Sequence, residues 1–175
     1  NVRRQQKVSH IQKLAYDSVS DRSLHILSIP SAAHIPQFGF ESEYFGVLLA
    51  WDSSETSEEV LLEVGKQLIT QGAVYVCCWG PGCEDVHDAI DHADQETIRP
   101  GDSVLMTTGH DGEPLSEALW FFLNSAFPHE LYEDGCRASI AIVVNNQSWA
   151  KECAAALAHP RQFSERALGE SHGAV

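Results

Sequence analysis

The sequence predicts an α/β protein, a three-layer α/β/α sandwich around a mainly parallel sheet with a flavodoxin-like or Rossmann-like layout. Strand-like and helix-like segments alternate four times from Phe45 onward, and the strand-like segments are apolar throughout. Strands that are covered by helices on both faces have this pattern, whereas strands with one face in water alternate apolar and polar residues. Right-handed crossovers then distribute the helices over both faces of the sheet.

The regular elements follow from short apolar runs and the polar residues that separate them. The strands are predicted over residues 45–51, 73–79, 103–108 and 137–144. Asp52, Ser53 and Ser54 supply N-cap residues ahead of the first helix. The helices are predicted over residues 55–70, 83–96, 115–127 and 149–158.

The two ends of the chain predict additions to this α/β domain, which should span residues 41–160. In residues 1–40, Val8, Ile11 and Leu14 have the spacing of one helical face, so we expect an N-terminal helical arm followed by a short edge strand. Residues 161–175 contain few apolar side chains and are expected to form a flexible tail.

The charge of the chain restricts the partners that it is expected to bind. The net charge is −14, and residues 41–134 carry twenty acidic side chains against two basic ones. Such a body repels phosphate backbones and attracts a basic protein partner, so no nucleic acid is expected. No apolar run is long enough for a membrane span, and no membrane association is expected. Cysteines within apolar segments indicate reduced thiols and a cytoplasmic location.

Polar and reactive residues follow the predicted strands at their carboxyl ends, which is the edge where open parallel sheets bind ligands. Because these ends meet at one edge, the side chains there form a candidate ligand-binding set. The set comprises Asp52, Cys78, Trp79, Thr108, Asp111, Glu113 and Asn145.

The stretch CCWGPGCEDVHDAIDHAD (77–94) offers a candidate catalytic site. Cys83 falls in the first turn of a predicted helix, where the helix dipole favours a thiolate. His87 or His110 would act as its base, and Asp111 or Glu113 would orient that histidine. The plain alternative is that the thiols are core residues and that the acidic residues form a solvated helix face.

The same stretch allows a metal site as a further alternative, although no cofactor is otherwise expected. Cys78, Cys83, His87 and His110 provide zinc-ligand chemistry, but their spacing is not a known zinc signature. The Gly-Pro-Gly turn that follows Trp79 could instead hold a small ligand or an anion.

The predicted helix over 115–127 is apolar on nearly all sides, so it needs covering on two sides. One stripe contains Leu115, Leu119 and Phe122, whereas Trp120 and Phe121 project away from it. We expect the N-terminal arm to cover Trp120 and Phe121, with a homodimer through these two residues as the alternative.

The blocks CCWGPGCExxHD, MTTGHDGEPLSEALWFFLNSAFP and IAIVVNNxxWA resemble a family of small uncharacterised bacterial proteins over residues 45–157. The resemblance implies that these blocks belong to one domain and implies no activity. We expect an acidic cytoplasmic binding or regulatory domain that recognises a protein partner, of the immunity type or as an accessory in a bacterial conflict system. The alternatives are a Cys/His-dependent hydrolase or transferase at the carboxyl edge, and a zinc-binding protein.

Overall fold

The sheet has six strands in the order β1-β2-β6-β3-β4-β5. In this computed structural model, residues 10–172 are described. The strands are β1 (Gln12–Asp17), β2 (Arg22–Ile29), β3 (Tyr44–Ala50), β4 (Ala73–Trp79), β5 (Met106–His110) and β6 (Cys136–Val144). All neighbouring strands are parallel except β1, which pairs antiparallel with β2. The mainly parallel α/β fold that the sequence predicts is confirmed.

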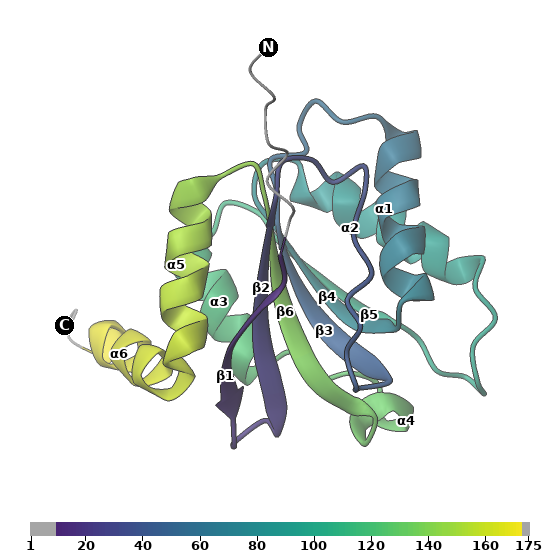
Figure 1. Cartoon of the computed structure of the whole chain (residues 1–175). Helices are drawn as coiled ribbons and strands as arrows, with labels where there is room; N and C mark the ends of the chain where they lie inside the picture. Colours follow the sequence, from purple (N-terminus) through teal and green to yellow (C-terminus); the bar gives the residue numbers. More distant parts are fainter. Residues whose placement is uncertain (1–9, 173–175) are drawn as a thin grey trace, which may run out of the picture.

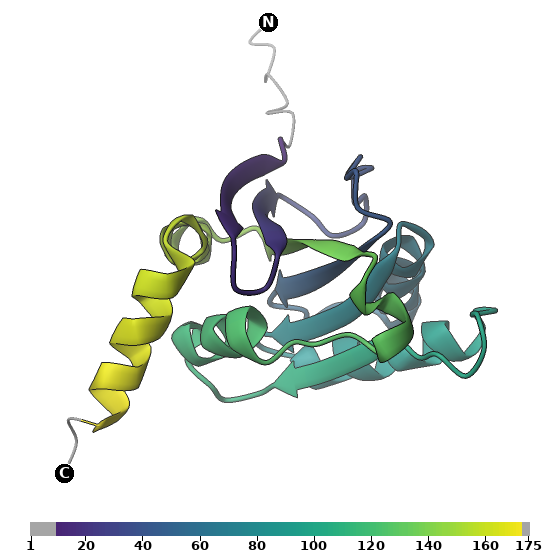
Figure 2. The same ribbon diagram turned by 90° about the horizontal axis from the view of Figure 1, so that it is seen from below.

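Helices cover both faces of the sheet and make three layers (Figures 1 and 2). One face carries α1 (Glu58–Thr70) and α2 (Cys83–Gln95). The other carries α3 (Leu115–Asn124), α5 (Gln147–Ala158) and α6 (Pro160–His172), and the single-turn α4 (Glu130–Glu133) precedes β6. No described helix is both long enough and apolar enough to cross a membrane.

The central strands are apolar throughout because both of their faces are buried. Val47 and Leu49 of β3 belong to the core beneath α1 and α2. Leu48 and Ala50 belong to the core beneath α3 and α5. All four residues are at most 1% exposed. Full burial of a Val or Leu side chain contributes roughly 1.5–3 kcal/mol, so both layers stabilise the same strand.

The N-terminal helical arm is wrong for the residues that the structure describes, because residues 12–17 form strand β1. Residues 1–9 of the expected arm lie outside the described part. The carboxylate of Asp17 accepts hydrogen bonds from the Val19 amide and the Ser20 hydroxyl, which makes the turn into β2. Asp21 completes that turn with a φ of 55°. Pairing with β2 then satisfies the backbone hydrogen-bonding groups of residues 12–17, the segment for which the sequence spacing predicted a helix.

The C-terminal segment also differs from the prediction, because α6 forms where a flexible tail was expected. Pro160 begins the helix, a position where its missing amide hydrogen is not needed. Phe163 packs against the core beneath α3, and the buried Ser164 hydroxyl accepts a hydrogen bond from Asn124 at 2.9 Å. Helix α6 therefore packs beside α3, the helix of Trp120 and Phe121, at a position that the sequence assigned to the arm.

Strand β5 lies a few residues later than predicted. Ser103 bonds through its hydroxyl to Pro100 and Tyr132, and the Leu105 amide donates to the carboxylate of Asp94. These side chains hold the apolar segment 103–105 outside the sheet, and pairing with β4 begins at Met106. As a consequence, His110 belongs to the strand.

Candidate functional site

The order of the strands creates a crevice between β3 and β6, which are neighbours in the sheet. After β3 the chain enters α1 on one face, and after β6 it enters α5 on the other. Loops that leave adjacent strands in opposite directions open a gap at the carboxyl edge, and α/β proteins bind ligands at such points.

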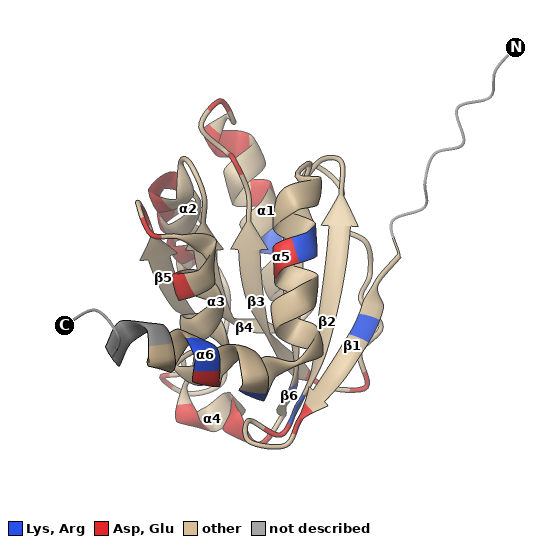
Figure 3. Cartoon of the chain, turned by 90° about the vertical axis from the view of Figure 1, so that its left-hand side faces the viewer, with Lys and Arg blue, Asp and Glu red and all other residues tan. Residues whose placement is uncertain are grey.

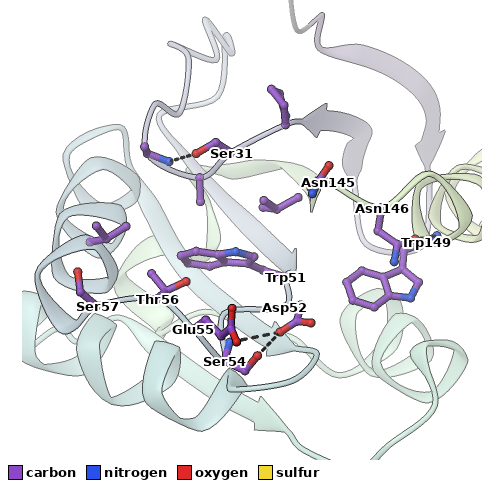
Figure 4. A pocket seen from close by; sticks show the side chains of 15 residues that line it. Ser31, Trp51, Asp52, Ser54, Glu55, Thr56, Ser57, Asn145, Asn146 and Trp149 are labelled. Atoms are coloured by element: carbon purple, nitrogen blue, oxygen red, sulfur yellow. Dashed lines mark hydrogen bonds between the residues drawn. The ribbon is translucent and has the colours of Figure 1, made fainter.

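A cavity of about 1000 Å³ occupies this position. We call it the crevice (Figure 4). Its walls come from the segments that follow β2, β3 and β6. The lining residues are Pro30, Ser31, Ala32, Ala33, Trp51, Asp52, Ser54, Glu55, Thr56, Ser57, Val60, Val144, Asn145, Asn146 and Trp149.

The wall formed by the loop after β3 is fixed by the neighbouring loop after β4. The Ser53 amide donates to Pro81 at 2.9 Å, and the Ser53 hydroxyl donates to the carbonyl of Gly82 at 3.0 Å. Gly80 has a φ of +113°, and a Cβ there would collide with the carbonyl oxygen of Trp51. Only glycine allows the two loops to approach so closely. The position of Asp52 is therefore set before any ligand binds.

Acidic and aromatic side chains dominate the chemistry of the crevice. In Figure 4 the Trp51 indole lies with the carboxyl groups of Asp52 and Glu55, and Trp149 lies on the opposite side with Asn145. No lysine, arginine or histidine is among the lining residues that the structure describes. The arrangement offers negative charge and aromatic rings to a ligand, and no positive charge.

The loop after β6 forms the opposite wall in a constrained conformation. Asn145 has a φ of 51°, in the left-handed region that non-glycine residues seldom adopt, and its amide donates to the carbonyl of Ile29 at 2.8 Å. The side chain of Asn146 accepts a hydrogen bond from the Trp149 amide and caps α5. Residues held in such conformations cluster at ligand-binding positions.

A second cavity lies at the outer edge of the sheet beside β5, and we call it the His110 pocket. It has a volume of about 920 Å³. Its lining residues are Thr108, Gly109, His110, Glu113, Ser116, Glu117, Trp120, Phe121, Phe163, Arg166, Ala167 and Leu168. His110 is 5% exposed, and its ring lies 4.9 Å from that of Phe121, centroid to centroid. The structure thus brings three predicted site residues, Thr108, His110 and Glu113, into one pocket.

The three predicted catalytic residues do not share one environment. Burial raises the pKa of the Cys83 thiol, and the backbone of His110 only partly offsets this effect, so burial opposes the thiolate that the helix dipole was expected to favour. His87 bonds instead to Asp88, at 3.0 Å, and lies 3.8 Å from the Asp91 carboxylate. Of the two histidines predicted as the base, His110 is the one hydrogen-bonded to a predicted orienting carboxylate, that of Glu113.

The alternative zinc ligands were Cys78, Cys83, His87 and His110. Cys78 is enclosed in the sheet, and burial raises its pKa well above the ordinary value. Within residues 10–172 no group of three or more His, Cys, Asp or Glu side chains is placed to hold a metal ion.

The other predicted ligand-binding residues do not gather at one cavity. Asp52 and Asn145 line the crevice, whereas Asp111 is exposed in the loop after β5 and lines neither cavity. Trp79 lies between the cavities: its ring is 4.8 Å from that of Trp149, and its Nε1 donates to the carbonyl of Glu113 at 2.8 Å.

The prediction missed Trp51, Glu55 and Trp149 of the crevice. Trp51 reads as the last residue of an apolar strand, and Glu55 and Trp149 read as helix residues. Their one detectable signal is position, since each lies within a few residues of a strand end at the carboxyl edge.

Comparisons with known proteins define the family of this chain without assigning an activity. No curated protein and no solved structure matches the chain. Residues 24–160 match a family model described as a domain of unknown function (DUF7684), and the chain belongs to this family.

Proposed function

We propose that the protein is an acidic binding domain that recognises a basic protein partner by taking a lysine or arginine side chain into the crevice. The observation that carries this proposal is the composition of the crevice walls. Two carboxylates, from Asp52 and Glu55, and two indoles, from Trp51 and Trp149, line a cavity at the β3–β6 junction, and the described lining contains no basic side chain.

The hydrogen bonds of Asp52 support a role for its carboxylate in binding a cation. Both the amide and the hydroxyl of Ser54 donate to Oδ1 of Asp52, at 3.3 and 2.6 Å. These bonds orient the carboxylate and leave Oδ2 available to a ligand. A guanidinium or ammonium group bonds strongly to such an oxygen, and the neighbouring indoles add cation–π attraction of about 0.5–2 kcal/mol.

Charge around the crevice supports a macromolecular partner. Glu58 and Glu59 lie in the first turn of α1, directly after Ser57 of the crevice wall. Figure 3 shows further acidic residues on α1 and α2, at the end of the molecule to which the β3 arrow points. With a net charge of −14, the domain would attract a basic surface over a distance of about 8–10 Å at ordinary salt. A cytoplasmic immunity-type protein that neutralises a basic toxin fits this chemistry.

Titration with N-acetyl-argininamide tests the proposal, with the citrulline analogue as its uncharged isostere. We expect the arginine compound to shift the indole NMR signals of Trp51 and Trp149, and we expect its binding to weaken as salt is added. The citrulline compound should leave both signals in place. Equal shifts from the two compounds would show that charge is not recognised.

The double variant Asp52→Asn with Glu55→Gln should weaken arginine binding by about tenfold or more, since charged hydrogen bonds contribute about 1.5–3 kcal/mol. The matched control is Glu130→Gln with Glu133→Gln, which removes the same charge from α4, away from the crevice. Equal losses in both variants would indicate attraction by net charge and no site in the crevice.

A further inference from the structure

Three side chains at the end of β5 form a continuous chain of hydrogen bonds. The Thr108 hydroxyl lies 3.0 Å from Nε2 of His110, and Nδ1 of His110 lies 2.9 Å from Oε2 of Glu113. With Nδ1 donating to the carboxylate, Nε2 is left to accept the hydroxyl proton. A hydroxyl, an imidazole and a carboxylate in this order are the arrangement of a nucleophile, its base and the group that orients the base.

Local structure explains why these residues meet. Thr108 and His110 are two residues apart on β5, so their side chains share one face of the sheet. The loop after β5 returns Glu113 to His110, and the Trp79 indole holds this loop by its hydrogen bond to the Glu113 carbonyl. The Phe121 ring packs on His110 in an edge-to-face arrangement.

The chain of hydrogen bonds borders a cavity that suits an apolar substrate. Thr108, His110 and Glu113 line the His110 pocket. Aromatic rings from α3 and α6, including Phe121 and Phe163, line the same cavity, and Glu117 and Arg166 add a charge of each sign. An acyl chain against these rings would place its carbonyl group near the Thr108 hydroxyl.

We propose that the His110 pocket is an acyl-transfer site that cleaves carboxylic esters with an apolar acyl group, with Thr108 as nucleophile, His110 as base and Glu113 as positioning residue. This site is independent of cation binding in the crevice. Oγ1 of Thr108 attacks the ester carbonyl carbon while Nε2 of His110 takes the hydroxyl proton. The bond from carbon to the alcohol oxygen breaks, and His110 returns the proton to that oxygen.

The acyl-threonine that remains is released by water. The water oxygen attacks the acyl carbon while Nε2 of His110 takes a proton from that water. The bond from the acyl carbon to Oγ1 of Thr108 then breaks, and His110 gives the proton to Oγ1. The products are the carboxylic acid and the free hydroxyl, so no further reactant is required.

Hydrolysis of p-nitrophenyl butanoate by the purified full chain tests the proposal. The wild-type protein should release p-nitrophenol faster than buffer does, and Thr108→Ser should remain active. The near-isosteric Thr108→Val variant and the His110→Ala variant should each lose on the order of 10²-fold in kcat. Glu113→Gln, at an exposed position, should lower kcat with KM unchanged, because Glu113 acts through His110. Glu130→Gln and Glu133→Gln, on α4 and outside the lining of both cavities, should keep wild-type rates.

Covalent labelling identifies the nucleophile directly. A fluorophosphonate with an alkyl chain should modify Thr108 in the wild-type protein, as located by peptide mass spectrometry, and should leave Thr108→Val unlabelled. Circular dichroism establishes that Thr108→Val is folded. A wild-type rate equal to that of buffer, equal hydrolysis by Thr108→Val, or a label on another residue would each overturn the assignment.

Discussion

The crevice and the His110 pocket use similar side chains in opposite ways. In the crevice, the carboxylates of Asp52 and Glu55 face a cavity whose described lining contains no basic residue. In the His110 pocket, the carboxylate of Glu113 is already bonded to an imidazole, which in turn contacts a hydroxyl. Charge that faces a cavity unpaired is suited to an external cation, whereas groups bonded in series are suited to moving a proton.

The two cavities also depend on different parts of the fold. The crevice lies between central strands, and backbone hydrogen bonds such as that from Ser53 to Pro81 fix its walls. The His110 pocket lies beside an edge strand and takes one wall from α6, the last helix described. Substitutions in α6 should therefore affect the His110 pocket and leave the crevice unchanged.

Among single substitutions, the largest expected effect on stability comes from Arg161→Met, which removes the ion pair that attaches α6 to β1. Arg161 contacts Asp17 at 2.9 Å and also donates to Asn124 of α3 at 3.1 Å. The variant leaves the carboxylate of Asp17 buried without its cation. Breaking a fully buried pair costs about 3–5 kcal/mol, and because Arg161 is partly exposed we expect a loss of about 2 kcal/mol in unfolding free energy.

Urea denaturation measures this loss, and Lys151→Met, which removes one positive charge from an exposed position on α5 outside both cavities, is the control, with an expected change within about 0.5 kcal/mol. At temperatures where the Arg161→Met protein is folded, ester hydrolysis should fall while arginine binding is retained. Equal damage to both activities would contradict the separation of the two cavities.

A second difference concerns the thiols, because Cys77 and Cys153 lie in the core layer next to the His110 pocket and no cysteine lines the crevice. Burial raises the pKa of each from 9.0 to about 12. Above pH 9 the unfolded chain loses these protons while the folded chain retains them. Stability is therefore complete below pH 9 and decreases toward pH 12, by about 1.4 kcal/mol per thiol for each pH unit.

Urea unfolding at pH 8 and pH 10 in the presence of a reductant measures this decrease. The Cys77→Ala, Cys153→Ala double variant should show a smaller decrease between the two pH values, whatever its stability at pH 8. Identical stability of the wild-type protein at both pH values would show that the thiols ionise without cost in the folded state.

Sequence patterns predicted the fold class because a strand that is buried on both faces is apolar at successive positions. Strand β3 is apolar at every position from Val47 to Ala50, as a doubly covered strand requires. The sequences of strand β1 and helix α6 show no comparable apolar pattern. Their stability depends on contacts with distant segments, namely the pairing with β2 and the packing of Phe163 near α3.

The sequence predicted that the candidate site residues lie at the carboxyl edge of the sheet, but it could not predict that they line two separate cavities. Asp52 and Asn145 were found because they follow strands, but nothing in the sequence shows that β6 lies between β2 and β3, and this order creates the crevice. Thr108 and His110 are two residues apart, which would place them on one strand face. The strand predicted from the sequence ends at Thr108, whereas β5 extends to His110, and only this extension places both side chains on one face.

The smallest expected effect comes from Trp79→Phe, which addresses the contact between the two cavities. Phenylalanine preserves an aromatic ring near Trp149 but removes the N–H group that donates to the Glu113 carbonyl at 2.8 Å. Since the loop of Glu113 is exposed, water replaces this bond, and we expect a loss of only about 0.5–1 kcal/mol in unfolding free energy. Ester hydrolysis should decrease because Glu113 orients His110, whereas argininamide binding should stay unchanged.

Trp149→Phe gives the reciprocal measurement, because Trp149 lines the crevice and does not line the His110 pocket. It should weaken argininamide binding and leave ester hydrolysis unchanged. If each variant instead altered both activities to the same extent, the Trp79–Trp149 contact would couple the cavities, and a basic partner bound in the crevice would change the rate at His110. Independent responses mean that the edge of one sheet supports two sites with separate chemistry.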